Sequence, residues 1–277
     1  FPDVDALKAL PDGALKGKIL FVDEVMTRTQ TGLGYGVAVR KRRAAAYEGE
    51  RLGAEAALIR SVGTSSHRFA HTGQMRRVTE EGAPGVPAAA LSAPDADQLR
   101  RILSRGETVT VKLVLTPETL PPATSGNVIA EIRGSESPDE IVLIGAHLDS
   151  WDLGDGSHDD GAGCVQSMDV LRLLKLAGYQ PKRTIRVVLF MNEENGLRGG
   201  RKYAEVASQK KERHLFALES DAGGFTPRGF SFDCSDAEFE RLSAWKPLFE
   251  PYLVHQFVRG GSGADIGPLK KEGLVLA

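Results

Sequence analysis

Imidazole and carboxyl side chains follow three apolar runs and one glycine-rich loop in the second half of the 277-residue chain. They are His147, Asp149, Asp159, Asp160, Glu193, Glu194 and Asp221. Several carboxylates gathered at one place repel one another and lose hydration, so such a cluster requires a cation. One histidine among carboxylates suits zinc or another first-row ion. A carboxylate that bridges two ions is typical of dinuclear hydrolases. If the four segments meet, the sequence predicts a metal site.

The apolar runs have the length of buried strands and alternate with helical patterns. Residues 140–146, 184–191 and 215–218 are predicted strands, and 161–177 and 197–208 are predicted helices. The other elements expected in this half are strands 127–134 and 252–258 and a helix 236–249. Such alternation predicts a mixed, mostly parallel sheet between helices. Ligands of such sheets bind beyond the carboxyl ends of the strands, where all these side chains would lie.

Each motif also has a simpler interpretation. Glu193 and Glu194 alone would most often be a solvated pair at a helix N-terminus, and the Asp159-Asp160 pair can cap the next helix. In an extended chain residues i and i+2 point to the same side, so Asp149 can hydrogen-bond the ring of His147. The coincidence of four such motifs at strand ends favours the metal site.

The first half predicts a smaller α/β unit. Its expected elements are strands 17–23, 56–62 and 108–115 and helices 37–52 and 94–104, with a long loop over 63–87. Three prolines within 116–126 mark a linker. Acidic residues outnumber basic residues after this linker, but not before it. We therefore expect two domains, residues 1–122 and 123–277.

Composition excludes several classes of protein. The net charge is -2, with 35 basic and 37 acidic residues, and no basic cluster is interleaved with aromatic residues, so we expect no nucleic-acid partner. No apolar run is long enough for a membrane span. Cys164 and Cys234 are too few for a disulfide scaffold. EF-hand, Walker A, dinucleotide-binding and Gly-x-Ser-x-Gly patterns are absent. The remaining histidines are expected to be structural or at the surface: His67, His71, His158, His214 and His255.

Five ordered motifs resemble those of the M28 family of zinc exopeptidases. They are Gly145-Ala-His-Leu-Asp-Ser-Trp-Asp152, His158-Asp-Asp-Gly-Ala-Gly163, Asn192-Glu-Glu-Asn-Gly196, Glu219-Ser-Asp-Ala-Gly223 and Gly261-Ser-Gly-Ala-Asp265. The sequence is most similar to the carboxypeptidase Q branch, and its first half resembles the protease-associated (PA) domain of that branch. The resemblance implies the phosphorylase/hydrolase-like fold of zinc exopeptidases, preceded by a PA-like α/β domain.

The resemblance also implies a role for each site residue. His147 and Asp221 would bind one zinc ion, Glu194 the other, and Asp159 would bridge both. Asp159 is preferred to Asp160 because it lies four residues before Gly163, as in the family. Asp149 would orient His147, and Glu193 would be the general base that takes a proton from the attacking water. The implied substrate is a short peptide with a free α-amino group.

The family's last ligand is a histidine that follows the motif ending at Asp265, and the printed sequence stops before it. We therefore expect one complete zinc site in these 277 residues and little or no peptidase activity. The opening segment that usually precedes the PA domain is also expected to be missing. The resemblance implies a secreted or periplasmic protein, and a homodimer is left open.

Two other functions are kept as alternatives. PA and peptidase folds that have lost their metal ligands occur in receptor ectodomains, although the ligands retained here argue against a receptor. Glutaminyl cyclisation or amide hydrolysis on the same fold is the second alternative, because a fold does not determine a function. The adjacent Glu193 and Glu194 and the PA-like half favour the peptidase.

Overall fold

The computed structural model describes residues 1–29, 32–71, 73, 75, 85–118, 120–151, 154–271 and 273–277. Asp152 of the first motif and residues 76–84 of the expected loop lie outside the described residues. The chain divides into two compact units, Phe1–Pro121 and Pro122–Ala277. No helix among the described residues is long and apolar enough to cross a membrane.

The first unit is a three-stranded parallel sheet with helices. Its elements are α1 (Asp5–Lys8), β1 (Ile19–Val22), α2 (Leu33–Arg51), β2 (Ala56–Arg60), β3 (Ala88–Leu91) and α3 (Ala93–Ser104). The strand order is β1-β2-β3, and the central strand β2 is buried along its whole length. Apolar side chains of α1, α2, β1 and β2 form its core, which includes Leu7, Leu20, Leu52 and Ile59.

A five-stranded sheet forms the centre of the second unit, in the order β10-β7-β5-β6-β4. Its strands are β4 (Val128–Ile132), β5 (Ser137–His147), β6 (Arg183–Phe190), β7 (Arg213–Glu219) and β10 (Val275–Leu276). All neighbours pair in parallel except β4, which runs antiparallel to β6 at the edge. The expected mixed, mostly parallel sheet is confirmed.

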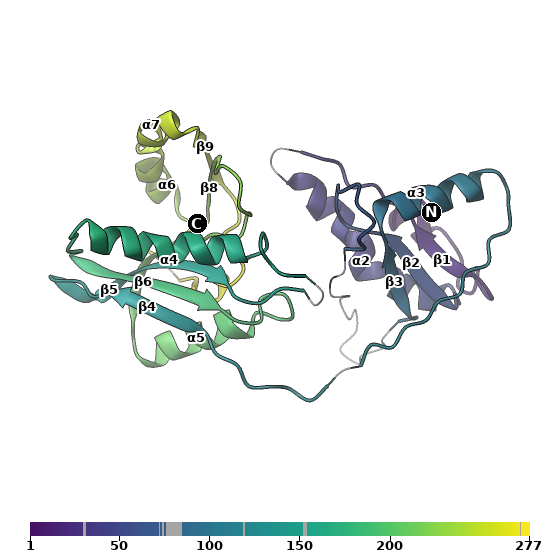
Figure 1. Ribbon diagram of the computed structural model, residues 1–277, viewed down its shortest axis with the longest axis horizontal. Helices are drawn as coiled ribbons and strands as arrows, with labels where there is room; N and C mark the ends of the chain where they lie inside the picture. The colour runs from purple at the N-terminus through teal and green to yellow at the C-terminus, as the bar shows by residue number, and fades with distance from the viewer. Residues whose placement is uncertain are drawn as a thin grey trace. The chain divides into compact units, whose positions relative to one another are not determined.

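Helices cover both faces of this sheet. In Figure 1, α4 (Gly161–Leu176) and α5 (Arg198–Gln209) lie on opposite faces. Because side chains alternate along a strand, Val188 and Phe190 pack with Tyr203 of α5, whereas Val187 and Leu189 pack with the α4 side of the sheet. Strand β6 is therefore apolar on both faces, which explains the continuous apolar run of the sequence there.

A small lobe follows β7. It contains a parallel pair, β8 (Gly229–Phe232) and β9 (Gln256–Arg259), with α6 (Asp236–Ser243), α7 (Lys246–Phe249) and the short 3-10 helix η1 (Glu250–Tyr252). A second 3-10 helix, η2 (Gly267–Leu269), packs against α5 and joins the core of the five-stranded sheet. The expected helix 236–249 is therefore broken at residues 244–245. The expected strand 252–258 begins only at Gln256, because residues 250–252 form η1.

The prediction of a strand over 108–115 is wrong. These residues form neither strand nor helix, and alternate between exposed and half-buried side chains. Alternating polarity favours a strand only when a neighbouring strand supplies hydrogen bonds and an apolar surface. The sheet of the first unit ends with β3, which provides no such pairing for this segment.

Candidate metal centre

His147 is the last residue of β5, the central strand of the sheet, and its side chain is 1% exposed. Its Nδ1 lies 2.8 Å from the backbone oxygen of Asp149. This contact leaves Nε2 free to face the carboxylates, as a metal-binding imidazole requires. The expectation that the Asp149 carboxylate holds the ring is therefore wrong: the Asp149 backbone carbonyl makes the contact, and the nearer carboxylate oxygen is 3.8 Å from Nδ1.

Two carboxylates face Nε2 of His147. Asp159 Oδ1 lies 3.0 Å from this nitrogen and Asp221 Oδ1 lies 3.4 Å from it. One ligand atom from each of the three residues lies within 4.8 Å of the others. Two ligands of a tetrahedral zinc ion with bonds of about 2.0 Å are separated by about 3.3 Å. Each of the two carboxylate oxygens therefore lies from Nε2 at about the distance expected for two ligands of one zinc ion.

The neighbouring Asp160 has a different function. Its carboxylate accepts hydrogen bonds from the backbone N–H groups of His147, at 3.0 Å, and Gly163, at 3.1 Å. It is the N-cap of α4 and is almost fully buried. The cap interpretation that applied to the Asp159-Asp160 pair thus holds for Asp160, while Asp159 faces the imidazole.

Glu193 and Glu194 follow β6, and Asp149 fixes their backbone. Asp149 Oδ1 accepts the N–H of Glu193 at 2.9 Å, and Oδ2 accepts the N–H of Glu194 at 3.2 Å. The Asp149 carboxylate thus connects the ends of β5 and β6. Glu194 Oε1 is buried and has no hydrogen-bond partner among the described residues. A buried carboxylate oxygen without a partner is costly, and a bound cation would compensate it.

Electrostatics at this edge favour a bound cation. Burial alone would lower the pKa of His147, but hydrogen bonds with Asp159 and Asp221 outweigh burial and raise it to about 12. Burial, together with the charges of Asp159 and Glu193, raises the pKa of Glu194 to about 7. Burial also raises the pKa of Glu193. A divalent ion would oppose the elevated carboxylate pKa values and displace the imidazole proton.

Two further carboxyl groups, those of Glu219 and Asp265, lie beside this cluster and have no role among the expectations drawn from the sequence. Asp265 is fully buried, and neither of its carboxylate oxygens has a hydrogen-bond partner among the described residues. Glu219, the last residue of β7, accepts the N–H of Ile266 through Oε2 at 2.9 Å. Burial raises the pKa of Glu219 to about 8 and that of Asp265 to about 7. The motif that ends at Asp265 was the feature of the sequence that could have indicated a role for this residue.

The remaining histidines lie outside the group formed by His147, Asp159 and Asp221. His214 is buried on β7 with Nε2 2.8 Å from the Tyr203 hydroxyl oxygen. His158 Nδ1 accepts the N–H of Gly224, and the Nδ1 of His255 lies 2.9 Å from the Leu253 oxygen. His67 and His71 belong to the first unit.

The mostly parallel sheet, with a histidine and carboxylates gathered at its carboxyl edge, defines a protein of the α/β class with a candidate metal centre. The pattern of Peptidase family M28 matches residues 127–273, more than half of the chain. The chain belongs to this family, which confirms the resemblance.

Known proteins extend the likeness over both units. Carboxypeptidase Q of Bos taurus is 37% identical over 91% of this chain and 52% of that protein, and carboxypeptidase Q of Homo sapiens is 35% identical over 88% and 51%. The chain thus spans about half the length of the curated relatives it matches. A peptidase M28 precursor from Shewanella amazonensis SB2B superposes with a TM-score of 0.87 at 40% identity, over 97% of this chain and 61% of that one. A zinc aminopeptidase from Bacillus subtilis, at 20% identity and a TM-score of 0.58, shares the fold.

Proposed function

We propose that the chain carries the metal centre of a zinc-dependent exopeptidase of the aminopeptidase or dipeptidase type. The observation that carries this proposal is the cluster of His147, Asp159 and Asp221 with Glu193 and Glu194 beside it. The relatives named carboxypeptidase Q and the zinc aminopeptidase of similar fold support it.

The donors present fit zinc, and they differ in what they contribute. His147, Asp159 and Asp221 would hold one ion, and Glu194 with Asp159 would hold a second more weakly. We therefore propose that the 277-residue chain binds close to one zinc ion tightly.

Catalysis would depend on a proton that Glu193 carries. A zinc ion bound at this site would lower the pKa of the attacking water and polarise the scissile carbonyl. Glu193 accepts the proton of that water and returns it to the leaving amine. Its backbone is fixed by the Asp149 carboxylate, and burial raises its pKa, which brings this base closer to neutrality. The peptide's free α-amino group would bind near the carboxylate cluster.

The surroundings of the site are part of the same proposal. We assign the first unit as a PA-like domain, and we place the protein outside the cytoplasm, secreted or periplasmic, as the resemblance to carboxypeptidase Q implies. The partner is a short peptide, and formation of a homodimer is open to measurement by sedimentation.

A pair of adjacent substitutions tests the proposal in the natural zinc-loaded protein. Glu193→Gln should retain zinc and lose several orders of magnitude in kcat for dipeptides, since it removes the proton acceptor. Glu194→Gln should instead lower the zinc content, because it removes a ligand. Near-native turnover by Glu193→Gln contradicts the proposal. Activity on N-terminal glutaminyl peptides without dipeptide hydrolysis would identify a cyclase instead.

A further inference from the structure

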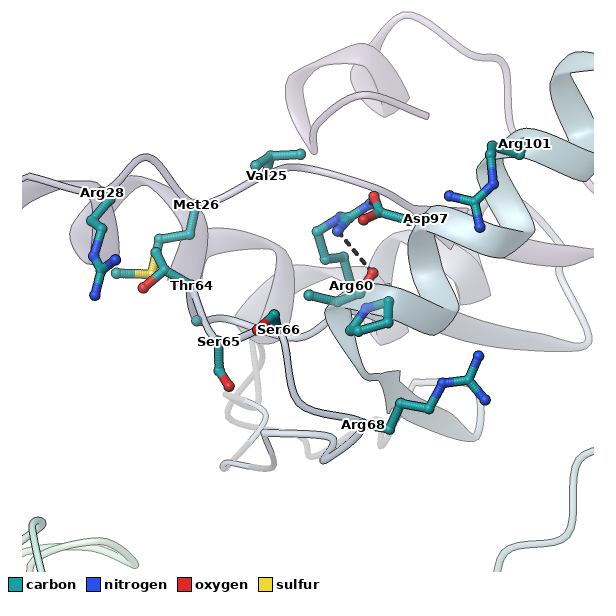
Figure 2. Close-up of a pocket in the computed structure, with 13 residues that line it drawn as sticks. Val25, Met26, Arg28, Arg60, Thr64, Ser65, Ser66, Arg68, Asp97 and Arg101 are labelled. Carbon is teal, nitrogen blue, oxygen red and sulfur yellow. Dashed lines mark hydrogen bonds and ion pairs between the residues drawn. The ribbon is translucent and has the colours of Figure 1, made fainter.

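The first unit contains a cavity of about 510 Å³ that the metal centre does not explain. It lies between the segment after β1, the loop after β2 and the start of α3, as Figure 2 shows. Its volume is in the range of pockets that bind small molecules. Four of its lining residues are arginines, Arg28, Arg60, Arg68 and Arg101, whereas its one acidic lining residue is Asp97.

Arg60 is a structural residue of the cavity wall. It is 3% exposed, and its guanidinium lies 2.7 Å from Asp23 Oδ1 and 2.6 Å from Asp97 Oδ1. It also donates to the backbone oxygen of Ala93 at 3.1 Å. Arg60 therefore joins β2 to α3, and its charge is already balanced.

The other three arginines leave a positive surplus. The two carboxylates that pair with Arg60 also pair with Arg100, which lies outside the cavity. The Arg100 guanidinium is 3.6 Å from Asp23 Oδ2 and 2.8 Å from Asp97 Oδ1. Arg68 has a single ion pair, 3.4 Å from Asp95, and its side chain is 68% exposed. Among the described residues, Arg28 and Arg101 have no ion pair within 4.0 Å. In Figure 2, Arg68 and Arg101 lie on one side of the cavity and Arg28 on the other.

The rest of the lining is of two kinds. Hydroxyl groups of Thr64, Ser65 and Ser66 come from the loop after β2, and apolar surface comes from Val25 and Met26. Guanidinium and hydroxyl groups together form charge-assisted hydrogen bonds with tetrahedral oxyanions, and Arg matches phosphate geometry through two parallel N–H donors. The apolar wall adds affinity for a carbon body attached to the anion.

We propose that this cavity binds a small organic phosphate or sulfate monoester. Arg68 and Arg101, with Arg28 opposite, hold the anionic group, and the organic part packs against Val25 and Met26. The inference does not depend on the proposed peptidase function, because every lining residue belongs to the first unit.

The test measures binding by isothermal titration calorimetry with the zinc-loaded 277-residue chain. Phenyl phosphate, phenyl sulfate and inorganic phosphate are titrated at constant ionic strength, so that the two ester classes and the contribution of the ring are separated. Because zinc itself attracts phosphate, each titration is repeated with Asp159→Asn, which impairs the metal centre and leaves the cavity intact. Arg68→Gln/Arg101→Gln removes two charges from the cavity. Arg105→Gln, on the residue that follows α3 and outside the cavity, is the matched control.

We expect one aryl ester to bind, with inorganic phosphate weaker. The double variant should bind at least about tenfold more weakly, since two charge-assisted hydrogen-bonding groups are lost. Arg105→Gln and Asp159→Asn should bind as the unsubstituted chain does. Binding that disappears in Asp159→Asn but survives in the double variant would assign the anion to the metal centre and overturn the proposal. The absence of binding by both esters would overturn it equally, and neither result bears on peptide hydrolysis.

Discussion

Asp159 and Asp160 are adjacent carboxylates with separate tasks. Asp159 is well exposed and faces Nε2 of His147, whereas Asp160 is buried and accepts two backbone N–H groups. We propose that the first contact serves metal binding, whereas the second caps α4. The two functions can therefore be separated by substitution.

We predict that Asp160→Ala lowers the free energy of unfolding by about 2–3 kcal/mol, because it removes a helix cap and leaves buried N–H groups unpaired. Asp159→Ala should cost less than Asp160→Ala in the metal-free chain, because Asp159 is well exposed, but it should weaken zinc binding strongly. Urea unfolding without metal and zinc titration by calorimetry measure the two effects. Equal destabilisation by both substitutions would contradict the division of tasks.

His214 makes stability depend on pH. Burial lowers its pKa from 6.5 to about 4, so the folded chain keeps this ring neutral while the unfolded chain protonates it first. Its stabilising contribution is complete above pH 6.5 and is lost as pH falls towards 4, by about 3 kcal/mol in total.

In His214→Gln this loss should be absent. The difference in unfolding free energy between the original chain and the variant should therefore shrink by about 3 kcal/mol from pH 7 to pH 4. Urea unfolding at pH 7, 5.5 and 4 measures it. A difference that does not change with pH would show that the pKa of His214 is the same in the folded and the unfolded chain, and would contradict the prediction.

At the scale of elements, the N-terminal turn of α4 touches the end of β7. A Cβ atom added to Gly163 would lie 1.8 Å from the backbone oxygen of Ser220 and close to the Asp160 carboxylate. Only glycine allows this approach, which brings Asp159, before the helix, close to Asp221, after the strand.

We predict that Gly163→Ala destabilises the second unit by about 3 kcal/mol and weakens zinc binding, because helix and strand must separate. The matched control is Gly36→Ala in α2, where a Cβ atom would contact nothing within 4 Å. That variant should be unchanged or more stable by up to about 1 kcal/mol. Thermal unfolding and zinc titration of both variants check the prediction. Unchanged zinc affinity in Gly163→Ala would show that this contact does not position the ligands.

The sequence predicted the elements whose patterns are local and strong. The apolar runs 140–146, 184–191 and 215–218 predicted three strands, and the structure has β5, β6 and β7 there. The site residues lie at or after the ends of these strands. Segment 108–115 was misread because its alternation says nothing about whether a neighbouring strand exists. The pair β8–β9 was incompletely predicted, since β8 depends on a partner 27 residues away, as in the pairing of Gly229 with Gln256.

Within the site, residue types and strand ends indicated His147, Asp159 and Asp221, and these do converge. Two details depended on three-dimensional contacts instead. The carbonyl of Asp149, and not its carboxylate, contacts the imidazole, while the carboxylate holds the backbone after β6. The burial of Glu219 and Asp265 arises from packing between β7 and a distant loop, which periodicity does not reveal.

At the scale of the molecule, each unit has its own apolar core, and the chain between α3 and β4 has no helix or strand among its described residues. Most of the described side chains there are exposed, including residues 105–107 and 120–126. We predict that trypsin or a less specific protease cuts within 105–126, or within the loop 63–87, before it cuts either core. Mass spectrometry of the first fragments locates the cut. A first cut inside β6 would contradict the prediction.

The central position of β5 has a kinetic consequence. The donors facing His147 come from segments before α4 and after β7, so they meet only when β5 has paired with strands distant in sequence. Strand pairing of this kind forms slowly, because the chain loses the entropy of loop closure before the new contacts stabilise it. A zinc ion held by these donors would bind only a chain whose sheet is already assembled, and it would leave the barrier to assembly unchanged. Its expected effect is on unfolding, because a bound ion would lengthen the lifetime of the native state.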